Sequence, residues 1–403
     1  MDTATLPMTT HARTGSTLGV ITLYASALAQ GLAVVSFPAS GNVLRGDYGI
    51  TDEGYGAIFL PQMALIILGS LGGAALSRRI SLRMLLLAAS ALAAASQLAL
   101  ASVSQVGSEL RLALLLLGTG LMGAGFGLSA APLNALPALL FPARAESALV
   151  ALHTSMGLGF ALGPLVVSWL SASGVWTAFP LSLLALSLVL SALAALSSLP
   201  SPARATGVEG ARASNDLRAL APFFAIAALY AFAEGTFSNW ASIFLVDDRH
   251  LEPERAALAL SAFWAALAVG RLLISALLAR VPARIVWPAL MVLMAVAFVV
   301  VPLAQGPVSG TLVFALAGLG CSAVFPLTVG LATLRAPDPA SASSLLVASL
   351  MVGVGTASFA LGALRSSLPL ETIYRLSAGY PLFALVLALV ILRRAGPRNG
   401  APS

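Results

Sequence analysis

The sequence alternates between long apolar runs and short breaks rich in charge, proline or glycine. A helix crosses the hydrocarbon core of a bilayer with about 20 mainly apolar residues, and twelve runs are long enough. The first six are predicted at 17–44, 54–77, 84–104, 110–138, 145–172 and 175–199. The other six are predicted at 220–246, 254–279, 285–304, 308–334, 340–364 and 373–392. We therefore expect an all-α membrane protein with twelve transmembrane helices.

The polar segments predict two halves of six helices each. The longest break between spans, 200–219, is rich in Pro, Gly and Ser and carries several charges, as expected of a linker. It separates an N-terminal half, 17–199, from a C-terminal half, 220–392, and tails are expected at 1–16 and 393–403. Residues 1–16 are polar and the run after them is too long for a cleavable signal, so that run is expected to stay as a membrane anchor.

The two halves also repeat a local pattern. Ser147 is followed by Gly157-Leu-Gly159 in the fifth predicted span, and Ser343 by Gly353-Val-Gly355 at identical spacing in the eleventh. The glycines of the fifth span, Gly159 included, are expected to pack helices closely, because small residues let two backbones approach. Repeated halves with a site between them are typical of secondary transporters.

The composition excludes other classes of protein. The chain is 59% hydrophobic and only 9% charged, with a mean hydropathy of +0.96, whereas a soluble domain carries about a quarter charged residues. This excludes a soluble enzyme, a nucleic-acid binder and a disordered scaffold. The net charge of +6 comes from arginines scattered singly between apolar runs, so no nucleic-acid partner is expected.

The arginines also predict the orientation, because cytoplasmic loops carry an excess of basic residues. An even number of spans puts both termini on one side, where fourteen arginines lie against six on the other. We therefore expect both termini in the cytoplasm and the chain in a bacterial inner membrane, since its Arg-, Ala- and Leu-rich composition is typical of a GC-rich genome. The terminal side carries Arg13, Arg78, Arg79, Arg83, Arg144, Arg204, Arg212, Arg218, Arg280, Arg284, Arg335, Arg393, Arg394 and Arg398. The opposite side carries Arg45, Arg111, Arg249, Arg255, Arg365 and Arg375.

Catalytic and cofactor motifs are missing from the sequence. It contains no metal-ligand cluster, nucleophile–base set or phosphate-cradling loop, and its Gly-x-Gly pairs lie in apolar runs with no strand before them. The single cysteine, Cys321, can form no intrachain disulfide. We expect a protein that is not an enzyme and that uses no cofactor or metal.

Several motifs resemble those of one transporter family. They are Tyr230-Ala-Phe-Ala-Glu234 with Ser238-Asn239-Trp240, Ser261-Ala-Phe263-Trp264 with Gly270-Arg271, Gly318-Leu-Gly320 with Phe325-Pro326, and His153 with Gly157-Leu-Gly159 and Gly163-Pro164. The whole chain resembles the major facilitator superfamily, and these motifs resemble its fucose permease-like branch of sugar–proton symporters. The resemblance implies the major facilitator fold, with Trp240 and Trp264 at positions that bind sugar in that branch.

The chain departs from that family at two places. The superfamily's loop after span two carries Gly, then Asp-Arg, then Gly-Arg-Arg; here Ser77 stands in place of the acid, while Arg78 and the arginines after it remain. Arg78 is therefore a candidate conformational charge. The branch often places acids in spans one and four, where this chain has neutral residues. Those neutral residues are Gln30, Ser36 and Asn42 in span one, and Ser129 and Asn134 in span four.

Glu234 is the deepest acid in the predicted spans. It lies 14 positions into a helix that begins at residue 220, about 21 Å from the cytoplasmic end. A carboxylate at this depth must be protonated, paired or facing water, which makes it a candidate for proton coupling and solute binding. Tyr230 and Ser238, one turn away on either side, extend the polar stripe. The alternative is a structural pair with Arg271, which lies about 12 Å into span eight.

Other polar and aromatic residues complete the candidate site. His153 titrates near neutral pH, so it is expected either to relay a proton or bind solute, or to bond a neighbouring helix. The amides of Gln62, Asn134 and Asn239 can bind a polar solute or bridge helices. Trp240, Phe263, Trp264 and Phe325 can stack on a sugar or face lipid. Arg271 is a second candidate conformational charge, although its side chain can instead snorkel towards the membrane surface.

We therefore predict a secondary transporter that takes up a small polar solute, most plausibly a sugar, by symport with protons through Glu234 and His153. It is expected to act as a monomer within the lipid bilayer. One alternative is a proton-driven exporter of drugs or hydrophobic metabolites, favoured by Gly159-x-x-x-Gly163-Pro164 in span five, which partly matches an antiporter motif. The other is a sensor or scaffold with this fold that transports nothing.

Overall fold

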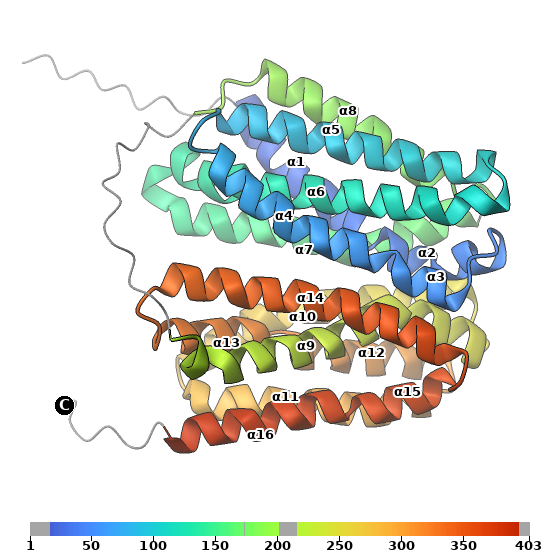
Figure 1. Cartoon of the computed structure of the whole chain (residues 1–403), viewed down its shortest axis with the longest axis vertical. Coiled ribbons are helices and arrows are strands. Elements are labelled where there is room, and N and C mark those ends of the chain that lie inside the picture. Colours follow the sequence, from blue (N-terminus) through green and yellow to red (C-terminus); the bar gives the residue numbers. More distant parts are fainter. Residues whose placement is uncertain (1–16, 173, 201–215, 395–403) are drawn as a thin grey trace, which may run out of the picture.

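The computed structural model describes residues 17–172, 174–200 and 216–394 (Figure 1). Within these ranges the chain is helical without strands, and twelve helical segments are long and apolar enough to cross a membrane. This confirms the twelve predicted spans. The predicted tails and most of the predicted linker lie outside the described residues.

The N-terminal half contains eight α-helices. They are α1 (Thr17–Val34), α2 (Ser36–Gly46), α3 (Asp52–Ala57), α4 (Phe59–Leu76), α5 (Leu82–Ala101), α6 (Ser108–Leu140), α7 (Ala145–Ser171) and α8 (Ala178–Leu196). The helices α1 and α2 form one membrane span, and α3 and α4 form the next. Figure 1 shows α5 and α8 at the edge of this half that is farthest from the other half.

The C-terminal half also contains eight α-helices. They are α9 (Leu217–Ile243), α10 (Pro253–Leu278), α11 (Ala283–Val300), α12 (Pro307–Cys321), α13 (Val324–Thr333), α14 (Pro339–Arg365), α15 (Leu370–Ser377) and α16 (Gly379–Arg394). A π-helical turn at Phe244–Asp248 extends α9. We call the end of the molecule where α1 and α9 begin the terminal end, and the end where α2 and α14 finish the distal end (Figure 1).

Prolines account for the breaks within several spans. A proline has no backbone N–H, so it removes the hydrogen bond to the carbonyl four residues earlier and bends the helix. Four helices that follow such a break have a proline within three residues of their start: Pro38 in α2, Pro61 in α4, Pro326 in α13 and Pro381 in α16. Four spans are therefore discontinuous helices.

Glycines bring the helices of each half close together. A Cβ atom built on Gly69 of α4 would lie 2.6 Å from the Ala124 carbonyl oxygen of α6, and one built on Gly159 of α7 would overlap the Leu28 carbonyl oxygen of α1. No side chain larger than hydrogen fits such positions without a shift of the backbone. The predicted packing role of Gly159 is confirmed.

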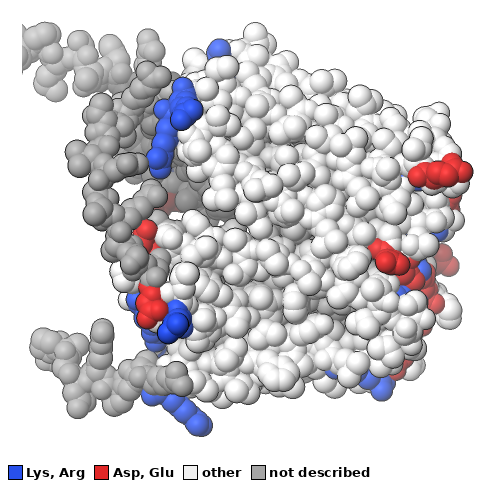
Figure 2. Space-filling model, in the orientation of Figure 1, with Lys and Arg blue, Asp and Glu red and all other residues white. Residues whose placement is uncertain are grey.

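On the face that Figure 2 shows, the charged side chains gather at the two ends of the molecule. Figure 2 shows a broad band without charged side chains between them. Large apolar side chains on the surface, such as Leu68, Leu188 and Phe383, are 56–68% exposed. Such a surface suits hydrocarbon and not water, and its ends would meet the two membrane interfaces.

Candidate functional site

The site is built around the break between α12 and α13. Pro326 cannot donate to the Ser322 carbonyl four residues earlier, so this oxygen is free to bond elsewhere. It accepts a hydrogen bond from Arg271 Nε of α10 at 3.1 Å. The neighbouring Cys321 carbonyl accepts from the Tyr230 hydroxyl of α9 at 3.1 Å, and the Tyr230 ring stacks on Phe325 with centroids 6.0 Å apart. The break thus joins three helices.

Glu234 lies one turn from Tyr230 on α9 and is partly accessible. Its carboxyl group is close enough to interact with the Tyr230 hydroxyl and with the charge of Arg271. Among the described residues, however, no ion pair joins Glu234 to Arg271, whose Nε is bonded to the Ser322 carbonyl. The carboxyl group therefore lies between a hydroxyl and a cation without a direct salt bridge.

The N-terminal half contributes His153 on α7. Helix α7 packs against α10 across the two halves: the Phe160 and Trp264 ring centroids are 4.9 Å apart. A Cβ atom built on Gly157 would lie 3.6 Å from the Ala268 Cβ atom. About one turn closer to the terminal end, His153 and Arg271 are both exposed and close enough for their charges to interact.

Other polar positions of α6 and α7 are also accessible towards the terminal end. Asn134 and Thr154 are exposed although they lie inside membrane spans. Each bonds a carbonyl of its own helix: Asn134 donates to Ala130 and Thr154 to Val150. Neither side chain therefore bridges to another helix. On the terminal side of the Phe160–Trp264 contact, the accessible polar side chains that the two halves bring close together are His153 and Arg271.

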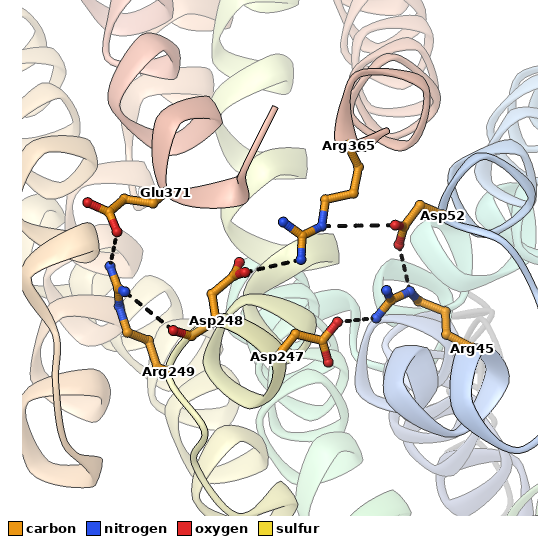
Figure 3. Close-up of polar contacts among 7 residues, drawn as sticks. All are labelled: Arg45, Asp52, Asp247, Asp248, Arg249, Arg365 and Glu371. Atoms are coloured by element: carbon orange, nitrogen blue, oxygen red, sulfur yellow. Dashed lines mark hydrogen bonds and ion pairs between the residues drawn. The ribbon is translucent and has the colours of Figure 1, made fainter. Parts of the chain in front are cut away.

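At the distal end, ion pairs close the space between the halves. Arg45 of the N-terminal half pairs with Asp52 at 2.6 Å and with Asp247 of the other half at 2.5 Å (Figure 3). Arg365 pairs with Asp248 at 3.1 Å and reaches back to Asp52 at 3.9 Å. Two cations and three carboxylates thus form one network that crosses between the halves.

Beneath this network, aromatic and polar side chains continue the closure. The Tyr55 hydroxyl of α3 donates to the Asn239 carbonyl at 2.7 Å, and its ring meets Trp240 edge-on with centroids 5.2 Å apart. Asn42 Nδ2 of α2 donates to the Ser242 carbonyl at 3.2 Å. The halves are therefore joined at the distal end by ion pairs, hydrogen bonds and aromatic contacts.

The structure separates the sequence-predicted site residues into three groups. Those around Glu234 and the break between α12 and α13 are His153, Tyr230, Glu234, Arg271 and Phe325, while Asn134 is exposed on α6. Those at contacts between the halves are Asn239, Trp240 and Trp264. Those buried inside one half are Gln62, Ser238 and Phe263, while Arg78 is exposed near the terminal end. Solute binding by any of them stays a prediction.

The buried candidates have partners within the protein. Gln62 Nε2 donates to Met122 Sδ at 3.6 Å, Ser238 Oγ donates to Asn239 Oδ1 at 3.3 Å, and Asn239 Nδ2 donates to Ser358 Oγ at 2.7 Å. These bonds link helices or neighbouring side chains, which was the alternative role considered for the amides.

Sequence reasoning did not single out the distal ion-pair network. It treated Arg45 and Arg365 as loop charges that report orientation. A signal was present, because Arg45 and Asp52 flank the first break of the N-terminal half and Asp247 and Asp248 flank the first break of the C-terminal half. These charges occupy corresponding breaks of the two repeated halves, and this was the one indication in the sequence that they lie close together.

Comparisons with known proteins agree on the fold. A family model described as the Major Facilitator Superfamily matches residues 21–357 and, in a second match, 223–403. No curated protein matches the chain in sequence. The chain is similar in structure to the nucleoside transporter NupG (D323A mutant), with a TM-score of 0.75 and 15% identity over 93% of this chain and 99% of that one. It is also similar to a POT family transporter in complex with a thioalcohol-conjugated peptide, with a TM-score of 0.74 and 15% identity over 95% and 97% of the two chains.

Proposed function

The chain belongs to the Major Facilitator Superfamily, and we propose that it is a symporter that couples the uptake of a small polar solute, such as a sugar, to protons through Glu234. The observation that carries the proposal is the position of this carboxyl group. It lies within a membrane span beside a discontinuous helix, next to Tyr230 and Arg271, and it is partly accessible. Transporters of this architecture bind solute and coupling ions at such broken helices.

The surroundings of Glu234 favour opposite protonation states. Its depth within the membrane spans disfavours a charged carboxylate. The Arg271 guanidinium instead favours the charged carboxylate. A carboxyl group held between these two influences can gain and lose a proton as its access to water changes.

Two hydrogen-bonding groups of α10 suit an uncharged, hydroxyl-bearing solute. Trp264 Nε1 and Ser261 Oγ, about one turn apart, are buried and have no hydrogen-bond partner among the described residues. A hydroxyl group accepts from the indole N–H and exchanges a bond with the serine, while the Phe160–Trp264 pair offers aromatic faces to the apolar side of a sugar ring. These features favour the branch of sugar–proton symporters.

A nucleoside is the second candidate solute. It combines sugar hydroxyl groups with a flat base that stacks on aromatic rings, and a nucleoside transporter is one of the similar structures. Trp264 Nε1 and Ser261 Oγ can bond its hydroxyl groups in the same way. The two candidates therefore differ in the solute and not in the proton site.

The direction follows from the predicted orientation. With the terminal end in the cytoplasm, the distal network would lie on the outer side, and the accessible His153 and Arg271 would lie on the cytoplasmic side of the Phe160–Trp264 contact. Rocking of the halves would break this network, expose Glu234 to external protons and admit solute. Return to the described state would then release both into the cell.

The test uses purified protein in two steps. A thermal-shift screen with monosaccharides, nucleosides, amino acids and lipophilic cations identifies a ligand, and proteoliposomes then measure its accumulation under an imposed pH gradient. Glu234→Gln should abolish accumulation but retain exchange of labelled for unlabelled ligand, because glutamine keeps the shape and fixes the neutral state. The control Glu146→Gln, an exposed acid at the terminal end of α7, should accumulate normally.

Two results would overturn the proposal. Stabilisation by lipophilic cations alone would favour the exporter. Normal pH-driven accumulation by Glu234→Gln would remove this residue from proton coupling and leave it a structural neighbour of Arg271.

A further inference from the structure

Two basic side chains, His153 of α7 and Arg271 of α10, face each other between the halves. The ring contact described above and the approach of Gly157 to Ala268 fix the register of these antiparallel helices. His153 is four residues from Gly157, and Arg271 is three residues from Ala268, both in the direction of the terminal end. Because residues three or four apart share a helix face, the two basic residues lie on the surfaces that face each other.

Both side chains are exposed although they lie inside membrane spans. His153 is eight residues from the start of α7, and Arg271 is seven residues from the end of α10, so each lies about 10–12 Å from the terminal end of its helix. Arg271 Nε bonds the Ser322 carbonyl at the break between α12 and α13. Its guanidinium group is therefore directed into the protein and not towards lipid.

The pair offers hydrogen-bond donors that have no protein partner. Among the described residues, neither Nη atom of Arg271 makes a hydrogen bond or an ion pair, and the His153 ring makes no hydrogen bond. The charge of Glu234 acts on Arg271, but no ion pair joins the two. An unpaired guanidinium group is costly at this depth. A second basic group beside it disfavours a cation as the partner, so the missing partner is an anion.

We infer that His153 and Arg271 bind a carboxylate group between the two halves, with the free N–H groups of Arg271 on its oxygens and a ring N–H of His153 completing the contact. The two Nη atoms of a guanidinium group form a planar fork that matches two carboxylate oxygens. The single permanent charge of Arg271 balances one negative charge. A phosphate group carries about −1.5 to −2 charges and would bring an excess into a partly desolvated place.

The experiment compares trifluoroacetate with 2,2,2-trifluoroacetamide, a neutral molecule of similar shape, by fluorine NMR. Each is titrated into the full chain in nanodiscs of uncharged net composition, and empty nanodiscs correct for binding to lipid. We expect saturable binding of trifluoroacetate and at least tenfold weaker binding of the amide. Acetate should displace trifluoroacetate, whereas chloride, which cannot use both arms of the fork, should displace it less effectively.

Variants of the two residues test the assignment. Arg271→Gln should weaken trifluoroacetate about ten- to a hundredfold, as expected for charge-assisted hydrogen bonds. Arg271→Lys keeps the charge without the fork and should weaken it less. His153→Phe keeps a ring without N–H groups and should weaken it about three- to tenfold. The matched control is Arg280→Gln, which removes an exposed arginine just beyond the end of α10 and should leave binding unchanged; circular dichroism checks that every variant folds.

A thermal-shift comparison then identifies the source of the carboxylate, and this step rests on the proposed uptake of a sugar. D-glucuronate carries hydroxyl groups and a carboxylate in one molecule, whereas an equimolar mixture of D-glucose and acetate separates them. A larger shift with glucuronate assigns the carboxylate to the solute, and an equal shift with the mixture assigns it to a separate anion. Trifluoroacetate binding without a shift by either sugar would count against the proposed sugar and leave the anion site standing.

Three results would overturn the inference. One is equal binding of trifluoroacetate and trifluoroacetamide, which would mean that charge is not recognised. Another is an equal loss of binding in Arg271→Gln and Arg280→Gln, which would indicate general attraction to basic residues. The third is displacement by chloride as effectively as by acetate, which would exclude recognition of a carboxylate.

Discussion

Replacing Gly56 by alanine should shift the protein towards a state that is open at the distal end. Gly56 of α3 packs across the halves against α14, and a Cβ atom there would lie 2.5 Å from the Ser358 carbonyl oxygen and 3.1 Å from the Phe359 Cα atom. Ordinary contacts begin near 3.4 Å, so the backbones of α3 and α14 must separate by about 1 Å. Backbone atoms, unlike the end of a flexible side chain, cannot turn away.

The size of the effect follows from the cost of overpacking, about 1–3 kcal/mol for an added carbon in a tightly packed place. Because the clash exists only while the distal ends touch, this cost falls on the described state and not on the state in which they part. The ratio of the two states should therefore change roughly 5- to 150-fold.

The matched control is Gly69→Ala in the same membrane span. Its Cβ atom would lie 2.6 Å from the Ala124 carbonyl oxygen of α6, a clash as severe as that at Gly56. Here both helices belong to the N-terminal half, which would move as one body in the proposed rocking. Gly69→Ala should therefore lower the thermal stability without favouring either state.

The assay is electron–electron double resonance between spin labels on cysteines at positions 47 and 366, in a chain that carries Cys321→Ser. Asp47 and Ser366 are exposed and belong to different halves at the distal end. Gly56→Ala should populate longer distances between the labels, and Gly69→Ala should not. An unchanged distance distribution in a folded Gly56→Ala protein, or an equal shift in both variants, would refute the reasoning.

Two other substitutions have defined outcomes. Asp247→Asn removes the ion pair with Arg45 across the halves. Because both side chains are partly exposed, the same assay should show a shift in the ratio of the two states of at most about fivefold. In 1 M salt, which screens the ion pair, the unaltered protein should shift by a similar amount, so that the two proteins no longer differ. A difference that persists in 1 M salt would mean that Asp247 acts through packing. Trp264→Phe keeps the ring but removes the unpartnered indole N–H, so the Kd of the ligand found by thermal shift should rise about three- to tenfold. Trp169→Phe, which alters a side chain that is 74% exposed, should leave this Kd unchanged, and equal effects of the two would exclude a direct bond.

The membrane spans could be predicted from the sequence because they depend on local properties. A helix in hydrocarbon satisfies its own backbone hydrogen bonds, so the length and apolarity of a run determine whether it spans. The same reasoning applies to the break at Pro326, since the loss of one N–H is a property of proline itself. The depth of Glu234 also follows from counting residues along one helix.

The partners of these groups were decided only by the tertiary structure. The missing N–H of Pro326 is a local property of the chain, but only the fold brings Arg271, 51 residues from Ser322, to the Ser322 carbonyl. The sequence leaves open whether Trp240 and Asn239 bind a solute or contact lipid or a neighbouring helix, and the docked halves place them against Tyr55. Likewise, Arg45 meets Asp247 only because two helix ends, 202 residues apart in the chain, converge when the halves close. Hydropathy determines where each span lies because it depends only on neighbouring residues in the sequence. These pairings depend instead on how the two halves pack together, which no local pattern specifies.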